Sequence, residues 1–131
     1  MIVLDASLVV ELLLQTPRAI LLTEDLLTPQ EDLHAPHLID VEVTQALRSL
    51  CARGELGDRR AQEAATDLAD LPLFRHSHEL LLGRAWELRS NLTIYDGVYV
   101  ALAELLEVPL WTLDQRIAGT PELRADVRVI Q

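Results

Sequence analysis

Residues 92–114 read LTIYDGVYVALAELLEVPLWTLD and combine two local patterns. The first part opens with Thr93, a good helix-capping residue, and then repeats apolar residues along one helical face. After Pro109 comes a short apolar run that predicts a buried strand, and this strand ends at Asp114. A buried helix that leads directly into a buried strand is typical of folds that pack helices against a parallel sheet.

The same alternation of helix and strand patterns extends over the whole chain. Thr16 and Pro17 favour a helix start, Gly54 favours a helix end, and Asp58 is a further candidate cap. No stretch resembles a linker, so we expect one α/β domain over residues 1–131 with a mostly parallel sheet. Strands are expected near residues 1–4, 33–35, 73–75, 110–113 and 127–130, and helices near residues 7–14, 17–27, 37–53, 59–70, 79–89, 93–105 and 115–118.

Composition narrows the functional classes open to these 131 residues. No apolar run approaches the ~20 residues that a membrane span needs, and the first residues predict a strand, not a signal peptide. We therefore expect a cytoplasmic location and no membrane partner. Cys51 is the only cysteine, so an internal disulfide and a cysteine-based zinc site are excluded.

The charge balance argues against broad binding to nucleic acid. The formal net charge is −10, and all 11 basic residues are arginines. Non-specific binding to a phosphate backbone needs a basic surface, which this chain lacks. If a cation neutralised part of the negative charge, however, the arginines could still hold phosphates in bidentate pairs.

Four acidic residues follow predicted strands or lie early in predicted helices, and we call them the acidic quartet. Parallel strands end at one edge of their sheet, and ligands of open α/β sheets bind beyond that edge. Clustered carboxylates repel one another, and a hard divalent cation with oxygen ligands relieves this repulsion. The pattern therefore favours a Mg²⁺ or Mn²⁺ site. The quartet is Asp5, Glu42, Asp96 and Asp114.

Each member of the quartet also has a simpler explanation. Asp5 and Asp114 could cap the helices that follow them, and Asp96 with Thr93 resembles a capping box. Glu42 could be a solvated acid near a helix start. Two hydroxyl residues near the quartet are candidates for orienting a carboxylate or the substrate: Ser7 and Thr112.

Other polar and aromatic residues give weaker patterns. The spacing of the histidines does not match a zinc site, and loop or capping roles are favoured for them. Trp86 and Trp111 occupy apolar positions that predict core packing. The histidines are His34, His37, His76 and His78.

Taken together, these segments resemble the PIN domain, in particular the VapC-type toxins of toxin–antitoxin pairs. The resemblance runs nearly end to end and is carried by Val3–Ser7, Ala35–Val43, Leu92–Ala103 and Val108–Asp114. Their order and spacing are more specific than any one segment. Gly97 departs from the pattern, in which alanine is commoner, but it is not a proposed ligand.

The resemblance implies a fold, an activity and partners. The fold would be a three-layer α/β/α sandwich with the acidic quartet holding one or two Mg²⁺ or Mn²⁺ ions. The activity would be hydrolysis of RNA by metal-activated water, as a toxin silenced by a cognate antitoxin. Such toxins commonly form homodimers. The apolar residues of the early helices, at positions 12–14, 20–22, 26 and 27, could offer a groove for an antitoxin segment.

Other classes fit less well. A receiver domain needs a lysine, which is absent from this chain, and an Asp-x-Asp phosphatase needs aspartate where Ser7 stands. The chain also lacks a glycine-rich phosphate loop. A non-catalytic PIN-like module that binds or regulates a partner remains the alternative to the enzyme.

Overall fold

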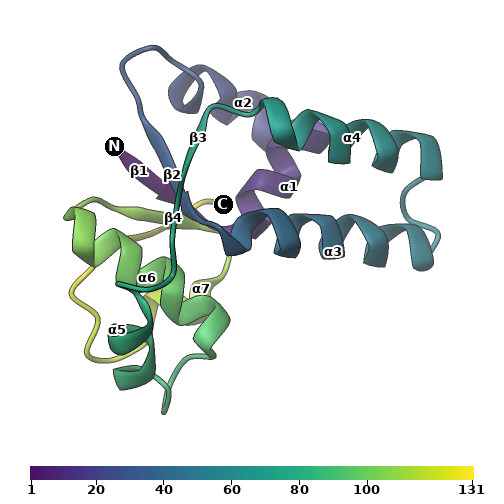
Figure 1. Cartoon of the computed structure of the whole chain (residues 1–131). Coiled ribbons are helices and arrows are strands. Elements are labelled where there is room, and N and C mark those ends of the chain that lie inside the picture. The colour runs from purple at the N-terminus through teal and green to yellow at the C-terminus, as the bar shows by residue number, and fades with distance from the viewer.

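The computed structural model describes residues 1–24 and 26–131, which form one parallel sheet with helices on both sides (Figure 1). All four strand pairings are parallel, and the strand order is β3-β2-β1-β4-β5. The strands are β1 (Ile2–Leu4), β2 (Leu33–Pro36), β3 (Leu73–His76), β4 (Leu110–Thr112) and β5 (Val127–Val129). The helices are α1 (Ala6–Leu14), α2 (Pro17–Leu26), α3 (Leu38–Ala52), α4 (Asp58–Asp70), α5 (Leu82–Glu87), α6 (Ile94–Leu106) and α7 (Gln115–Ala118).

The helices form two layers around the sheet, as the α/β/α prediction required. Figure 1 shows α1 to α4 gathered on one side, while α5 and α6 lie on the other. The contacts agree with this view. Helix α1 packs on β4 and helix α3 on β2, while α6 packs across β1, β2 and β4. The three central strands are apolar and buried because helices cover both of their faces.

The strand order places a topological switch point between β1 and β4. The chain builds outward from β1 through β2 to β3, and then returns to the other side of β1 with β4 and β5. Ligands of open α/β sheets bind beyond the carboxyl ends of the strands at such a point. We call this edge of the sheet the carboxyl edge and the opposite edge the amino edge.

Most helix starts follow the predicted capping residues. Asp5, Thr16, Thr93 and Asp114 each accept a hydrogen bond from a backbone N–H in the first turn of their helix. Asp58 was wrongly expected to cap α4, because it is the first residue of that helix and Gly57 holds the cap position.

Helices α5 and α6 approach each other closely at Gly97. A Cβ atom added there would lie 3.1 Å from the Ala85 Cβ and 3.2 Å from its Cα. A glycine at position 97 therefore permits a tight contact between the two helices, which accounts for its departure from the alanine that is commoner in the family pattern.

Among the described residues, no single helix has the length and apolarity to cross a membrane. Only α1 taken together with residues 17–24 reaches that length and composition, and the two are bent by 97°.

Candidate active site

The acidic quartet lies around the switch point at the carboxyl edge. Asp5 follows β1 directly, and Asp114 lies two residues beyond the end of the neighbouring strand β4. Glu42 comes from the second turn of α3 and Asp96 from the first turn of α6, and both helices run back from the same edge. Charges on Asp5 and Asp96 influence Glu42, and Asp114 influences Asp96, so the quartet is one electrostatic group.

Asp5 is the most enclosed member of the quartet, with 8% of its surface exposed. The Ser7 hydroxyl donates to its Oδ1 at 2.6 Å, and the Leu8 N–H donates to the same oxygen at 3.2 Å. The Thr112 hydroxyl donates to Oδ2. Burial nevertheless raises the pKa of Asp5 above its ordinary value, because these bonds only partly replace lost water.

Ser7 and Thr112 also tie Asp5 to the segment that carries Asp114. Ser7 Oγ accepts from the Leu113 N–H at 3.3 Å, and Thr112 Oγ1 accepts from the Asp114 N–H at 3.0 Å. Thr112 is fully buried. Each hydroxyl thus donates to the Asp5 carboxylate at the end of β1 and accepts from a backbone N–H just after β4. These bonds fix the separation of the two strand ends.

Glu42 and Asp96 are partly buried and poorly compensated. Burial is the largest cause that raises the pKa of each, and neighbouring carboxylates of the quartet raise it further. The Tyr99 hydroxyl faces Glu42, but it is buried without a hydrogen bond of ordinary geometry. Sequence patterns missed Tyr99, because a tyrosine on the buried face of α6 resembles any core aromatic.

Asp114 is held differently, because Arg116 of the short helix α7, which Asp114 caps, pairs with its carboxylate. Arg116 Nη2 donates to Asp114 Oδ2 at 2.6 Å, and Arg116 Nε lies 3.1 and 3.2 Å from the two carboxylate oxygens. The Arg116 N–H donates to Oδ1 at 2.9 Å. The hydrogen bond with the Arg116 side chain is the main cause that lowers the pKa of Asp114.

The donor chemistry of the quartet fits a hard divalent cation, since it consists of carboxylate oxygens that raise one another's pKa. The side chains are not arranged as a finished site, however. Within residues 1–24 and 26–131, no three acidic, histidine or cysteine side chains converge closely enough to hold an ion as they stand. The Asp114 carboxylate is instead paired with Arg116.

Comparison with known proteins places this arrangement in a family. The sequence model of the PIN domain matches residues 2–123. The chain belongs to the PIN-domain family. Ribonuclease VapC12 of Mycobacterium tuberculosis is 40% identical over 130 residues, covering 99% of each chain. Ribonuclease VapC1 of the same organism is 37% identical over 130 residues, covering 98% of this chain and 97% of its own.

Solved structures support the same fold. VapBC2 of Rickettsia felis, bound to a DNA fragment from its promoter, contains a chain that matches with a TM-score of 0.71 at 14% identity, with full coverage of both chains. A chain of FitAcB from Neisseria gonorrhoeae matches with a TM-score of 0.69 at 17% identity, covering 97% and 96% of the two chains.

The histidines of this PIN domain belong to the strands β2 and β3 and to the residues that follow them. His34 Nδ1 lies 2.8 Å from His76 Nε2, and His78 Nε2 accepts from the Leu38 N–H at 2.9 Å. The second bond is a capping role of the expected kind, since Leu38 opens α3. The loop or capping roles predicted for His34 and His76 are wrong, because these residues lie in β2 and β3. His34 is buried in β2 and stacks on Phe74.

Trp86 was wrongly predicted to pack in the core, because 60% of its surface is exposed. The apolar residues of this segment form two helical stripes, and the buried stripe is Leu81, Ala85 and Leu88. Ala85 faces the close approach of α6 at Gly97, where a tryptophan would not fit. Trp86 instead stacks against Arg89, whose guanidinium carbon lies 4.4 Å from the ring centroid.

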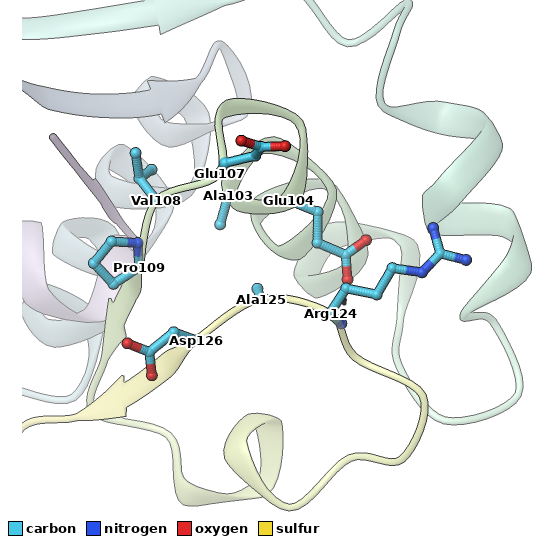
Figure 2. Close-up of a pocket in the computed structure, with 8 residues that line it drawn as sticks. All are labelled: Ala103, Glu104, Glu107, Val108, Pro109, Arg124, Ala125 and Asp126. Atoms are coloured by element: carbon cyan, nitrogen blue, oxygen red, sulfur yellow. Dashed lines mark hydrogen bonds between the residues drawn. The ribbon is translucent and has the colours of Figure 1, made fainter.

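A larger hollow of this PIN domain lies at the amino edge, far from the quartet in the fold. It has a volume of about 500 Å³ and is formed by the end of α6, the start of β4 and the chain that enters β5. Figure 2 shows Glu104 beside Arg124, with Glu107 and Asp126 at other parts of the rim. Glu104 is fully paired here, with Arg84 Nε at 2.7 Å and the Arg124 N–H at 2.8 Å.

Proposed function

We propose that this PIN domain is a Mg²⁺- or Mn²⁺-dependent endoribonuclease that acts as a VapC-type toxin. One observation carries the proposal: three partly or fully buried carboxylates with raised pKa values lie around the switch point of the sheet and influence one another. Such poorly compensated charge is typical of a site that holds a ligand. Relatives named as VapC ribonucleases, about 40% identical over the full chain, supply the reaction class.

The chain's own residues would prepare the site in three ways. Ser7 and Thr112 fix the Asp5 carboxylate, so that its oxygens point where β1 and β4 end. Glu42 and Asp96 add anionic oxygens from two helices. A bound divalent ion would supply an activated water and stabilise the leaving oxygen of a phosphodiester. No side-chain nucleophile is needed for this reaction.

A cognate antitoxin is the protein partner that we propose. The supporting observation is an exposed apolar surface on α2, where Leu21 is 81% exposed and Ile20 and Leu27 are also exposed. This surface belongs to the early helices in which the sequence predicted a groove for an antitoxin segment. Solved structures with the same fold include toxin–antitoxin complexes, one of them from Klebsiella pneumoniae.

A homodimer is the second assembly that we propose. Leu82 and Trp86 are both exposed and lie one helical turn apart on α5, so they share a face. Large exposed aromatic and apolar side chains are enriched at interfaces between proteins. Light scattering of the wild type and of Trp86→Glu would test this, because a dimer through α5 should dissociate in the variant. Action in the cytoplasm stays a prediction from the sequence.

The activity is tested by incubating the purified protein with total cellular RNA and Mg²⁺ or Mn²⁺, followed by mapping of new RNA ends. We expect discrete new ends that disappear with a chelator and in Asp96→Ala. Cleavage that persists in Asp96→Ala would refute the assigned site.

A non-catalytic partner-binding module is the competing function. The Asp114–Arg116 pair favours it to a degree, because it neutralises one acid without any metal. Metal titration separates the two readings. In a nuclease, Mn²⁺ at 100 times its Kd should raise the free energy of unfolding by about 2.7 kcal/mol, and the unfolding temperature should rise with it. A binding module should show neither this shift nor RNA cleavage.

A further inference from the structure

Arg116 is the cation that faces the acidic quartet most directly. Its charge lowers the pKa of Asp96 as well as that of Asp114, and no other arginine is among the main influences on the four acids. Other arginines are committed elsewhere: Arg75 to Asp40 and Arg84 to Glu104. Arg116 is therefore the positive group best placed to meet an anion at this site.

The contacts of Arg116 occupy both carboxylate oxygens of Asp114. Nε and Nη2 reach Oδ2, while Nε and the backbone N–H reach Oδ1. A divalent ion that takes Asp114 as a ligand needs at least one of these oxygens. Metal and guanidinium therefore compete for the same group.

The pair is built to exchange partners. The Arg116 side chain is 85% exposed, and ion pairs that exposed are weakly held. A guanidinium fork has the geometry to bind a phosphate in the same bidentate way as a carboxylate. Beside it lies a hollow of about 150 Å³, lined by Thr93, Asp96, Asp114 and Arg116 among others.

We propose that Arg116 is the residue that binds an RNA phosphate at this site, and that it is stored on Asp114 until a divalent ion takes that carboxylate. The inference rests on the proposed nuclease function and adds the chemistry of substrate recognition to it. It also explains how a chain of net charge −10 binds a polyanion, since the Arg116 guanidinium is released from Asp114 only when the metal is bound.

The proposal predicts two effects of opposite sign in Arg116→Gln. Mn²⁺ binding by the RNA-free protein, measured by calorimetry, should tighten about three- to tenfold, because the competing guanidinium is gone. Binding of a labelled phosphorothioate RNA of mixed sequence, measured by anisotropy at saturating Mn²⁺, should weaken about tenfold, because the phosphate loses its bidentate partner.

Two further variants separate charge from geometry. Arg116→Lys keeps the charge without the fork, so it should bind Mn²⁺ like the wild type and RNA with intermediate affinity. Arg128→Gln removes a similar arginine, also two residues after an aspartate and paired with it at 3.0 Å, but on β5. This control should change neither affinity.

Unchanged Mn²⁺ affinity in Arg116→Gln, or tighter Mn²⁺ binding with unchanged RNA affinity, would overturn the proposal. Both measurements are made without turnover, so they remain informative if the wild type cleaves no natural RNA. A wild type that cleaves no natural RNA would overturn the proposed nuclease function, and the two affinities would then decide the role of Arg116.

Discussion

The two edges of the sheet both carry acids, but they treat the negative charge in opposite ways. At the carboxyl edge, burial and neighbouring acids raise the pKa values of Asp5, Glu42 and Asp96. At the amino edge, burial would also raise the pKa of Glu104, but hydrogen bonds from Arg84 and the Arg124 N–H lower it overall. At Glu104 the hydrogen bonds from its partners outweigh the effect of burial, whereas at the quartet they do not.

This contrast separates an acid that stabilises the fold from acids that await a ligand. The larger hollow lies at the amino edge, yet its buried carboxylate is already satisfied. The smaller hollow adjoins the uncompensated acids. Unsatisfied charge is therefore a better guide to the candidate site of this protein than the size of a cavity.

The largest expected effect comes from removing one uncompensated charge. Asp96→Asn should lower metal-dependent RNA cleavage by about 10³-fold or more, because a metal ligand is lost. Its melting temperature should stay the same or rise, since a repelled charge is removed. Asp126→Asn at the amino edge is the matched control and should cleave normally. Normal cleavage by Asp96→Asn would end the distinction between the two edges.

A smaller loss should follow when the charge stays but its support is removed. Thr112→Val deletes the buried hydroxyl that donates to Asp5, so we expect cleavage to fall about 10- to 100-fold. Thr112→Ser keeps a hydroxyl and should retain most activity. Single-turnover rates at saturating Mn²⁺ measure this effect, and equal rates for the valine and serine variants would show that the hydroxyl has no orienting role.

At the amino edge the expected effect is on stability alone. Glu104→Gln leaves the mostly buried Arg84 with only the exposed Glu87 as a charged partner, so we expect a loss of about 1–3 kcal/mol in the free energy of unfolding. Glu107 lines the same hollow but is exposed, so Glu107→Gln should change the free energy of unfolding by less than about 0.5 kcal/mol. Urea unfolding compares them. Reduced cleavage by folded Glu104→Gln would contradict a purely structural role.

The smallest effect concerns pH. The metal-free protein should lose stability as pH rises from about 4 to neutral, because three quartet acids bind protons more tightly when folded than when unfolded. Glu104 acts in the opposite sense, and its contribution is lost only as pH falls below the ordinary carboxyl range. Thermal unfolding at both pH values measures the slope.

Saturating Mn²⁺ should reverse this pH slope, because protons then compete with the ion for the same oxygens. Asp96→Asn should flatten the slope of the metal-free protein. A slope that is unaffected by both changes would mean that the quartet is not the source of the pH dependence.

The fold was predictable from sequence because its determinants are local. The alternation of apolar patterns and the caps Asp5, Thr16, Thr93 and Asp114 define most element boundaries within a few residues. The switch point then follows from strand order, which the sequence does not encode locally. The positions of the quartet at strand and helix starts could be predicted, but the electrostatic coupling of its members required the structure.

The sequence predictions fail where two local patterns are equally good and only a tertiary contact decides between them. Two apolar stripes were available on α5, and the close approach at Gly97 selected the one that contains Ala85, leaving Trp86 exposed. Tyr99 and Arg116 were overlooked for a related reason. Their importance lies in which carboxylate they face, and an arginine two residues after an aspartate occurs at position 128 as well.

The hydroxyl of Thr112 reaches back across 107 positions to Asp5, and this has a consequence for biosynthesis. The strand β1 leaves the ribosome well before its neighbour β4, which follows it in the chain. A nascent or prematurely released chain therefore carries Asp5 without the support that orients it. Whatever chemistry this edge performs begins only after β4 has been synthesised and paired with β1, which gives the producing cell a built-in delay.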